Sequence, residues 1–449
     1  MERRLESRPV TRDAAAGERL PLYARLTVAA IALSPFQYAL TLRTGFPLKI
    51  CEVLIVLAAA AFLVIPRRLR GPRDSSNILV GVLLAAVGIS AVINLAVPPA
   101  LSDAPGFGRS VTVDLLLYVG YAALVGIAWF MMRTLPSDVF GRALVVAVWL
   151  CGAATLFQSL MMTLGYPQVI ESLGFTSPLS GRTEGDETLR SGPFLEGQHL
   201  GFFAGAALLV CLHRRAWVGA AIAVGMALYS ESTTSIVGLV VGAVLAIVAR
   251  PNGKALVSLA AIPIGLGVIV ALYRPFREWV LFQGAKLGIV VGDEYSRYIT
   301  LSRDIRGMKT EIGWRILAEH PVIGVGSGRY GIAFHEFSDQ YALPGYYYDG
   351  SVRAIAENAY AQVAAEQGLL GLGAFLALIG FLILRNLKRK PYQATLVALA
   401  GFVAMAISTQ SSWTFIPIWV FLAYLAIDHE VKSSPGPIRQ RKLLTIRGR

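Results

Sequence analysis

The chain has 449 residues, of which 55% are apolar and only 15% are charged, with a mean hydropathy of +0.58 and a formal net charge of +13. A soluble protein of this length carries more charge and shorter apolar runs, so the composition excludes a water-soluble globular protein. Runs of about 17–22 weakly charged residues recur along most of the chain, and this is the length that crosses a bilayer as a helix. We predict an all-α polytopic protein whose main partner is the lipid bilayer.

Twelve membrane-spanning helices are expected in chain order, two of them short. They lie near residues 26–42, 48–65, 76–97, 112–132, 143–164, 197–212, 216–230, 233–249, 255–273, 357–384, 394–410 and 416–427. The predicted organisation is a tail over 1–25, nine helices over 26–273 with a loop at 165–196, a large loop over 274–356, three helices over 357–427 and a tail over 428–449. We expect the first apolar run to stay as an anchor, because no small-residue cleavage site follows it.

Most basic residues fall on one side of these helices, in "RRLRGPR" at 67–73, in "RNLKRK" at 385–390 and in the two tails. Lys and Arg mark cytoplasmic connectors, so both termini are predicted in the cytoplasm and loops 165–196 and 274–356 outside. The basicity is therefore a topology signal, and it argues against a nucleic-acid partner. The three cysteines lie inside apolar spans and predict no disulfide: Cys51, Cys151 and Cys211.

The large loop contains two recognisable features. "SRDIRGMKTEIGWRILAEHP" (302–321) predicts an amphipathic helix ended by Pro321. "HPVIGVGSGRYG" (320–331) contains a G-x-G-x-x-G pattern, but it lacks the preceding strand and the soluble α/β unit of a dinucleotide site. We expect a flexible turn whose backbone N–H groups approach an anion.

The stretch "ENAYAQVAAEQGLLGL" (357–372) places polar groups at the outer end of a membrane helix. Asn358, Gln362 and Glu366 share one face, and Glu366 lies nearly three turns deep, where a carboxylate must face protein or water. Glycines for close helix packing follow it: Gly368, Gly371 and Gly373. An interfacial helix start with a dipole-capping Glu357 is the structural alternative. The depth of Glu366 favours the other interpretation, in which this polar helix start lines a functional site.

Two further polar stretches flank predicted spans. "LRSGPFLEGQHLGFF" (189–203) places Arg190, Glu196 and His199 at an outer mouth, with Glu196 and His199 spaced i, i+3. One such pair is not a metal site, and no other His has a partner at metal-ligand spacing, so we expect neither metal nor cofactor. "YSESTTSIVGL" (229–239) carries Glu231 at its tip and is either a plain connector or part of the site.

These motifs resemble those of the O-antigen ligase and polymerase superfamily, the Wzy-like and WaaL-like membrane glycosyltransferases of bacterial surfaces. Asn358, nine further residues, and then Gly368 and Gly371 match the signature that follows the family's long periplasmic loop, although Glu357 replaces its His. Arg306 stands fifteen residues before Pro321 and the "PVIGVGSG" turn, as in the family. "RSGPF" resembles its Arg-x-Gly-x-Phe segment, whereas Thr233 occupies a position where many members have Arg.

The resemblance implies a GT-C-like, metal-independent inverting enzyme in the bacterial cytoplasmic membrane with its site facing the periplasm. Its substrates would be an undecaprenyl-pyrophosphate-linked oligosaccharide donor and an acceptor sugar hydroxyl, and a chain-length regulator is left open as a partner. By this resemblance Glu357 is the base, in a partly apolar mouth that raises its pKa, and Asn358 positions it. Arginines bind pyrophosphate, and further polar residues line the site: Arg303, Arg306 and Arg190, with Glu196, His199, Tyr360 and Glu366.

Three functions stay open at this point. Glu357 in place of His favours a polymerase of O-antigen, capsule or exopolysaccharide repeat units over an O-antigen ligase or an oligosaccharyltransferase. A transporter or flippase is the alternative of a different class. Transporters place polar groups at the midplane of paired broken helices and often repeat internally, whereas these polar groups gather at the outer helix ends.

Overall fold

Helices make up nearly all of the regular structure in the computed structural model of the chain. It describes residues 20–43, 47–64, 74–96, 111–176, 190–251, 272, 274–287, 289, 293–338, 341 and 354–429. The one exception to the all-α prediction in these ranges is a two-residue antiparallel hairpin, β1 (Leu42–Arg43) with β2 (Pro47–Leu48).

The helices of the bundle are α1 (Leu22–Ala32), α2 (Ile50–Val64), α3 (Ser75–Ala96), α4 (Val111–Arg133), α5 (Ser137–Thr163), α6 (Pro167–Ser172), α7 (Gly197–Arg214), α8 (Trp217–Tyr229) and α9 (Thr233–Ala249). The large loop holds α11 (Arg274–Lys286), α12 (Asp293–Glu319) and α13 (Tyr330–Ser338). The chain then returns to the bundle with α14 (Ala359–Leu387), α15 (Ala394–Ala406), the 3₁₀ turn Ile407–Thr409 and α16 (Ile416–Ala426).

Four described helices are long and apolar enough to cross a membrane: Ser75–Ala96, Leu115–Arg133, Ser137–Thr163 and Ala359–Leu387. They support a polytopic membrane protein, but the twelve predicted spans are not confirmed. Several predicted runs form shorter apolar helices, as where α1 ends at Ala32 shortly before Pro35, and most of the predicted span 255–273 lies outside the described residues.

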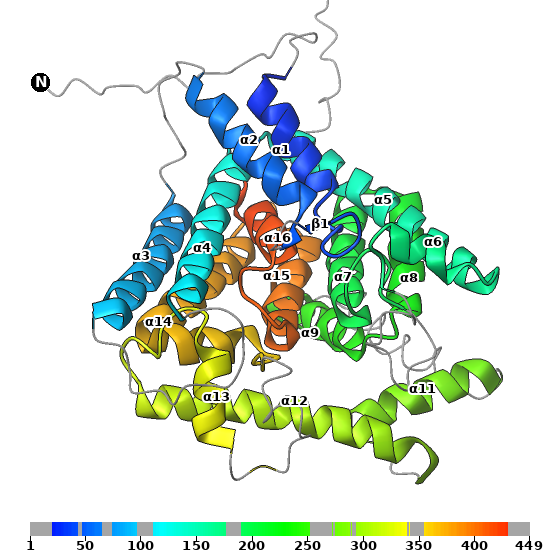
Figure 1. Cartoon of the computed structure of the whole chain (residues 1–449). Coiled ribbons are helices and arrows are strands. Elements are labelled where there is room, and N and C mark those ends of the chain that lie inside the picture. The colour runs from blue at the N-terminus through cyan, green and yellow to red at the C-terminus, as the bar shows by residue number, and fades with distance from the viewer. Residues whose placement is uncertain are drawn as a thin grey trace, which may run out of the picture.

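Helices α15 and α16 lie in the middle of the bundle, with α7 beside them (Figure 1). Every residue of α16 is buried, and most of α7 is buried as well. Their aromatic side chains interlock, with Phe202 and Phe203 of α7 against Phe421 of α16 at ring-centroid distances of 5.9 and 5.8 Å. A helix that is apolar on all sides is buried against other helices, which explains why these two lie inside.

Charged side chains join helix ends at one end of the bundle. Asp74, just before α3, pairs with Arg133 at the end of α4 (Nη2 to Oδ2, 2.8 Å) and with Arg385 near the end of α14. Arg385 also contacts Asp428 after α16 at 2.7 Å. These pairs lie at the end of the bundle that the sequence predicts to be cytoplasmic. The large loop lies at the opposite end, where α14 begins.

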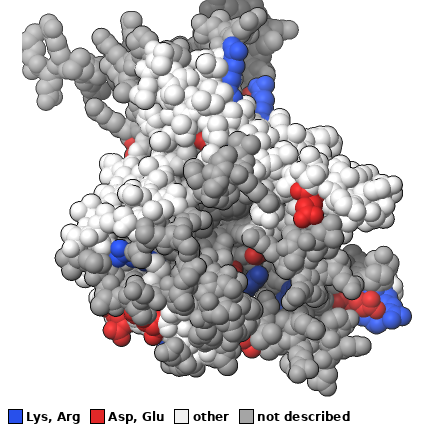
Figure 2. Space-filling model, viewed as in Figure 1, with Lys and Arg blue, Asp and Glu red and all other residues white. Residues whose placement is uncertain are grey.

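The large loop closes that opposite end. In Figure 1, α12 runs across the lower ends of the bundle helices, with α13 in front of it and α11 beside it. The prediction of an amphipathic helix ending before Pro321 is confirmed, although the helix begins earlier, at Asp293. Ile312 and Ile316 are fully buried, because they pack against Val325, α13 and α14. Figure 2 shows a hollow above α12 in which both acidic and basic side chains are visible.

A break in α14 fixes the loop to the bundle. Gly368 has φ 64° and ψ −161°, which interrupts the helix, and the turn after α12 fills the break. The N–H groups of Val325 and Gly326 donate to the carbonyls of Ala365 and Glu366 (2.9 and 3.0 Å), and the N–H of Leu369 donates to the carbonyl of Pro321 (2.7 Å). The expectation that this turn offers its N–H groups to an anion is therefore wrong for these two residues, since both donate to α14.

Two glycines make this close approach possible. A Cβ on Gly324 would lie 2.4 Å from the carbonyl oxygen of Ala365, and one on Gly368 would lie 2.4 Å from the carbonyl carbon of Val322. Both have positive φ, which also favours glycine. The expected role of the α14 glycines in packing between helices is thus replaced at Gly368 by a backbone junction, and Gly373 faces open space.

Candidate active site

Arg306 lies over the N-terminus of α7. Its Nη1 donates to Oε1 of Gln198 at 2.6 Å, and its Nη2 lies 3.7 Å from Oε2 of Glu196. The Arg306 and Glu196 side chains keep 45% and 39% exposure, so both reach the aqueous side of the loop. Glu196 is the N-cap residue and not a member of the helix, which separates it from the helix face that the i, i+3 spacing with His199 suggested.

Glu357 forms a buried ion pair with Lys309, three residues after Arg306 on α12. Lys309 Nζ lies 2.8 Å from Glu357 Oε1, and the two side chains are only 5% and 9% exposed. Oε2 of Glu357 has no hydrogen-bond partner among the described residues. One oxygen of this carboxylate is therefore fixed, while the other is a buried acceptor without a partner among the described residues.

The pKa of Glu357 lies below its ordinary value. Burial raises the pKa of this carboxyl group, but the Lys309 ammonium, the Arg306 guanidinium and His199 together lower it by more. The expectation of a raised pKa is therefore wrong, because the sequence reading took the apolar mouth into account but not a lysine beside the carboxylate. Glu357 is ionised at neutral pH and can accept a proton without losing one first.

His199 lies on the α7 side of the same region and is almost completely buried. Its ring packs on Phe415 with 5.1 Å between centroids, and its Nε2 lies 3.5 Å from Oγ of Ser411. Gln198 donates from Nε2 to the carbonyl of Thr409 at 2.8 Å. The connector between α15 and α16 thus completes one wall of the site.

Asn358 and Tyr360 hold the start of α14. Asn358 is its N-cap residue, and its Oδ1 accepts hydrogen bonds from the N–H groups of Tyr360 (3.0 Å) and Ala361 (3.3 Å). The Tyr360 hydroxyl donates to the carbonyl of Ala404 in α15 at 2.7 Å. The described contacts of both residues are within the protein, and the substrate contact expected for Tyr360 stays a prediction.

Glu366 is 1% exposed and faces the protein interior, as its depth in the helix required. Its Oε1 accepts from the N–H of Tyr330 at 3.4 Å and lies 3.5 Å from Nε2 of Gln362. Oε1 of Gln362 accepts in turn from the N–H of Trp413 at 3.3 Å. Gln362 and Glu366 thus lie on one polar face of α14, as predicted. They are buried, and they hydrogen-bond to α13 and to the connector 407–415.

Arg190 flanks the other side of the α7 N-terminus. Its Nη1 pairs with Glu231, at the turn between α8 and α9, and its backbone packs against Gly197. Lys286 of α11 donates to the carbonyl of Glu231 at 3.0 Å, so this turn also anchors the large loop. Arg190, which the sequence predicts to bind pyrophosphate, is thus paired with the Glu231 carboxylate. Arg303 falls within α12, but its side chain lies outside the described residues.

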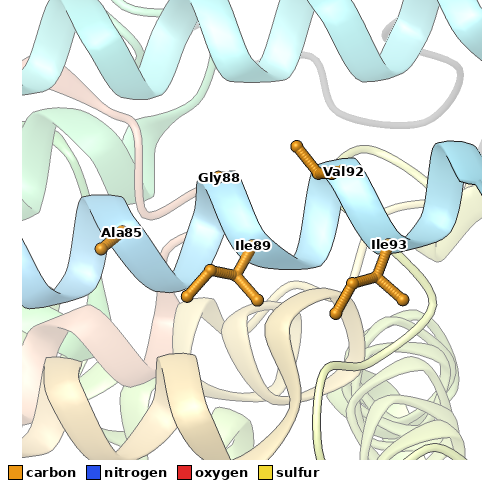
Figure 3. A pocket seen from close by; sticks show the side chains of 5 residues that line it. All are labelled: Ala85, Gly88, Ile89, Val92 and Ile93. Atoms are coloured by element: carbon orange, nitrogen blue, oxygen red, sulfur yellow. The ribbon is translucent and has the colours of Figure 1, made fainter.

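A shallow apolar groove of about 440 Å³ lies elsewhere, on α3. Figure 3 shows its lining, with Ile89 and Ile93 pointing toward α14 and Val92 pointing the other way. No hydrogen-bonding side chain lines this groove, so it offers no group for the reaction. Within the described residues, no three His, Cys, Asp or Glu side chains gather as a metal site would require.

Sequence reasoning missed three residues of this site: Lys309, Gln198 and Ser411. A signal for Lys309 was present, because it follows Arg306 at i+3 on a predicted helix and so shares its face. Gln198 and Ser411 carried no such signal, since their partners come from distant parts of the chain. Together the site offers an ionised carboxylate, fixed cations and a helix N-terminus at one end of a membrane bundle.

Residues 218–376 match the family model described as O-antigen ligase. The match covers less than half of the chain, but it contains Arg306, Lys309 and Glu357 as well as the broken part of α14. It confirms the resemblance to the O-antigen ligase and polymerase superfamily, which supports a glycosyltransferase-like role in surface glycan assembly. No curated protein matches the chain.

Proposed function

We propose that this chain, with its confirmed resemblance to the O-antigen ligase and polymerase superfamily, polymerises bacterial surface polysaccharide. It extends O-antigen, capsule or exopolysaccharide chains from undecaprenyl-pyrophosphate-linked units at the periplasmic face of the cytoplasmic membrane. The observation that carries the proposal is the Glu357 carboxylate, which has one oxygen held by Lys309 and the other unpartnered, beside Arg306 at the loop end of α14.

The donor pyrophosphate fits the N-terminus of α7. The first N–H groups of a helix have no partner within the helix, and they attract anions together with its dipole. Arg306 and Arg190 lie on two sides of this N-terminus, and Arg303 comes from the same helix as Arg306. Arginine binds phosphate oxygens through a planar fork that stays charged, so these cations stabilise the leaving group without a metal.

Glu357 serves as the base in the transfer. The acceptor hydroxyl donates its proton to Oε2 while its oxygen attacks the anomeric carbon. The bond from that carbon to the pyrophosphate oxygen breaks, the bonding electrons leave with the undecaprenyl pyrophosphate, and the configuration inverts. His199 and Ser411 lie on the α7 side of the carboxylate, where they can contact sugar hydroxyls.

Glu357 at the position where the ligases carry His supports a polymerase over a ligase or an oligosaccharyltransferase. A transporter of lipid-linked units is less well supported, because the charged groups of the site, Arg306 with Glu196 and Lys309 with Glu357, lie at the loop end of the bundle. The carboxylate of Glu366, deep in α14, is tied to backbone and amide partners. A chain-length regulator is a further proposed partner of the polymerase.

Purified protein in lipid nanodiscs, supplied with lipid-linked repeat units, tests the function. A polymerase produces a ladder of products that lengthens with time and releases undecaprenyl pyrophosphate. Transfer of single chains to a lipid A core acceptor without a ladder would establish a ligase instead. Movement of intact lipid-linked units across a vesicle membrane without any new glycosidic bond would establish a transporter.

A further inference from the structure

Lys309 is buried, and its ammonium group contacts Glu357. The residue is 4% exposed, and its backbone carbonyl accepts the Tyr330 hydroxyl at 2.6 Å. The next residue, Thr310, donates from its hydroxyl to the carbonyl of Ala356 at 3.2 Å. Helix α12 is thus clamped to the segment that carries Glu357, which aligns the ammonium and the carboxylate.

The charged groups around Glu357 come from two elements. Lys309 and Arg306 face it from α12, and His199 faces it from α7. Arg306 is shared with Glu196 and Gln198 and is partly exposed, so it has other partners and is screened by water. Among the described cations near Glu357, Lys309 alone is both buried and in direct contact with the carboxylate.

We infer that Lys309 is a positioning residue for the base: it fixes Oε1 of Glu357 and keeps the carboxylate ionised, so that Oε2 is the atom that takes the acceptor proton. This inference rests on the proposed function, because it needs Glu357 to act as the base. A buried carboxylate without a partner becomes protonated and loses its basic form. Lys309 prevents this and contacts only Oε1, so Oε2 keeps its capacity to accept a hydrogen bond.

The pH dependence of the reaction separates this role from a structural one. Without the Lys309 charge, burial still raises the pKa of Glu357, and only Arg306 and His199 remain to lower it. The protonated form of Glu357 then persists to higher pH. Lys309→Gln keeps a donor to Oε1 and removes the charge. The ratio of polymerisation rates between about pH 8 and about pH 5.5 should then grow by roughly tenfold or more relative to wild type. Arg315→Gln, an exposed cation of α12, is the matched control and should keep the wild-type profile.

Two further variants decide the remaining outcomes. If Lys309→Gln does not accumulate, Lys309→Arg retains the charge and should show the wild-type acid limb at a lower rate. An unchanged profile in folded Lys309→Gln, or a displaced acid limb in Lys309→Arg, would overturn the inference. Glu357→Gln tests the base assignment separately: full activity in that variant refutes the proposed site, whereas its inactivity together with an unchanged Lys309→Gln profile refutes only the role of Lys309.

Discussion

At the scale of single residues, the site depends on a glutamate in an unusual backbone conformation. Glu357 has a φ of 56°, a left-handed value that costs a non-glycine residue roughly 1 kcal/mol or more. The conformation turns its side chain toward Lys309 just before the N-cap Asn358 begins α14. Local strain of this kind persists where surrounding contacts fix it, here the ion pair and the Thr310 hydrogen bond.

Glu357→Gln should lower the transfer rate by roughly 10²–10⁴-fold, which is the usual scale for the loss of a general base. The amide keeps the size of the side chain but cannot accept the hydroxyl proton, and the cations that bind the donor stay in place. The rate is measured with lipid-linked units in nanodiscs at matched protein levels. Glu366→Gln is the comparison. Because Glu366 has buried contacts to α13 and to the connector, this variant should have a lower melting temperature, while the folded protein keeps most of its turnover.

Arg306→Lys should raise the KM for the lipid-linked donor and lower turnover by roughly tenfold or more, since Lys keeps the charge but loses the bidentate fork. Steady-state kinetics against donor concentration measure both effects. Arg315→Lys on the exposed side of α12 is the control, and surface pairs of this kind contribute little. Wild-type kinetics in Arg306→Lys would remove this residue from the donor site.

At the scale of elements, the junction between the loop turn and α14 determines where the site residues lie. Backbone hydrogen bonds join the turn 321–326 to both sides of the Gly368 break, and this attaches the end of α12 to the first part of α14. Ser90 of α3 adds to the junction, because its hydroxyl lies 2.7 Å from the carbonyl of Ile323. The base and the cations are therefore positioned by elements that come from separate parts of the chain.

Gly368→Ala should destabilise the protein by roughly 1–3 kcal/mol, because alanine disfavours the positive φ and its Cβ would collide with Val322. Gly373→Ala is a matched control in the same helix, since nothing lies within 4 Å of its Cβ position. It should be neutral or slightly stabilising. Thermal unfolding in detergent compares the two. Equal melting temperatures would mean that the break does not need glycine.

The sequence predicted the elements better than their junctions. The amphipathic pattern and Pro321 located the helix 302–321, and the depth of Glu366 required a protein partner, as found. The break at Gly368 was not predicted, because a glycine that packs and a glycine that interrupts a helix look alike without the segment that docks there. Lys309 was not predicted for a similar reason, because its partner Glu357 lies 48 residues away in the chain.

At the scale of the whole molecule, two charged ends enclose an apolar middle. The site lies at the start of α7, and the Arg214–Asp138 pair lies at its other end. Helix α7 has 18 residues, or about 27 Å, close to the thickness of the hydrocarbon core. We therefore predict that the two ends lie at the two faces of one bilayer.

Cysteine labelling in intact cells tests this arrangement. Glu311→Cys on exposed α12 should react with a membrane-impermeant maleimide, whereas Lys388→Cys after α14 should react only after permeabilisation. The native cysteines are buried and give little background. Labelling of Lys388→Cys alone in intact cells would invert the predicted topology.

The break in α14 also bears on how the protein is made. Around Gly368, carbonyl and N–H groups find their partners in the turn 321–326, which the ribosome synthesises earlier. If α14 left the translocon before that turn was in place, these groups would face lipid unpaired, at a cost of several kcal/mol. We therefore predict an order in biogenesis, in which the turn 321–326 is in place before the part of α14 behind Gly368 is completed.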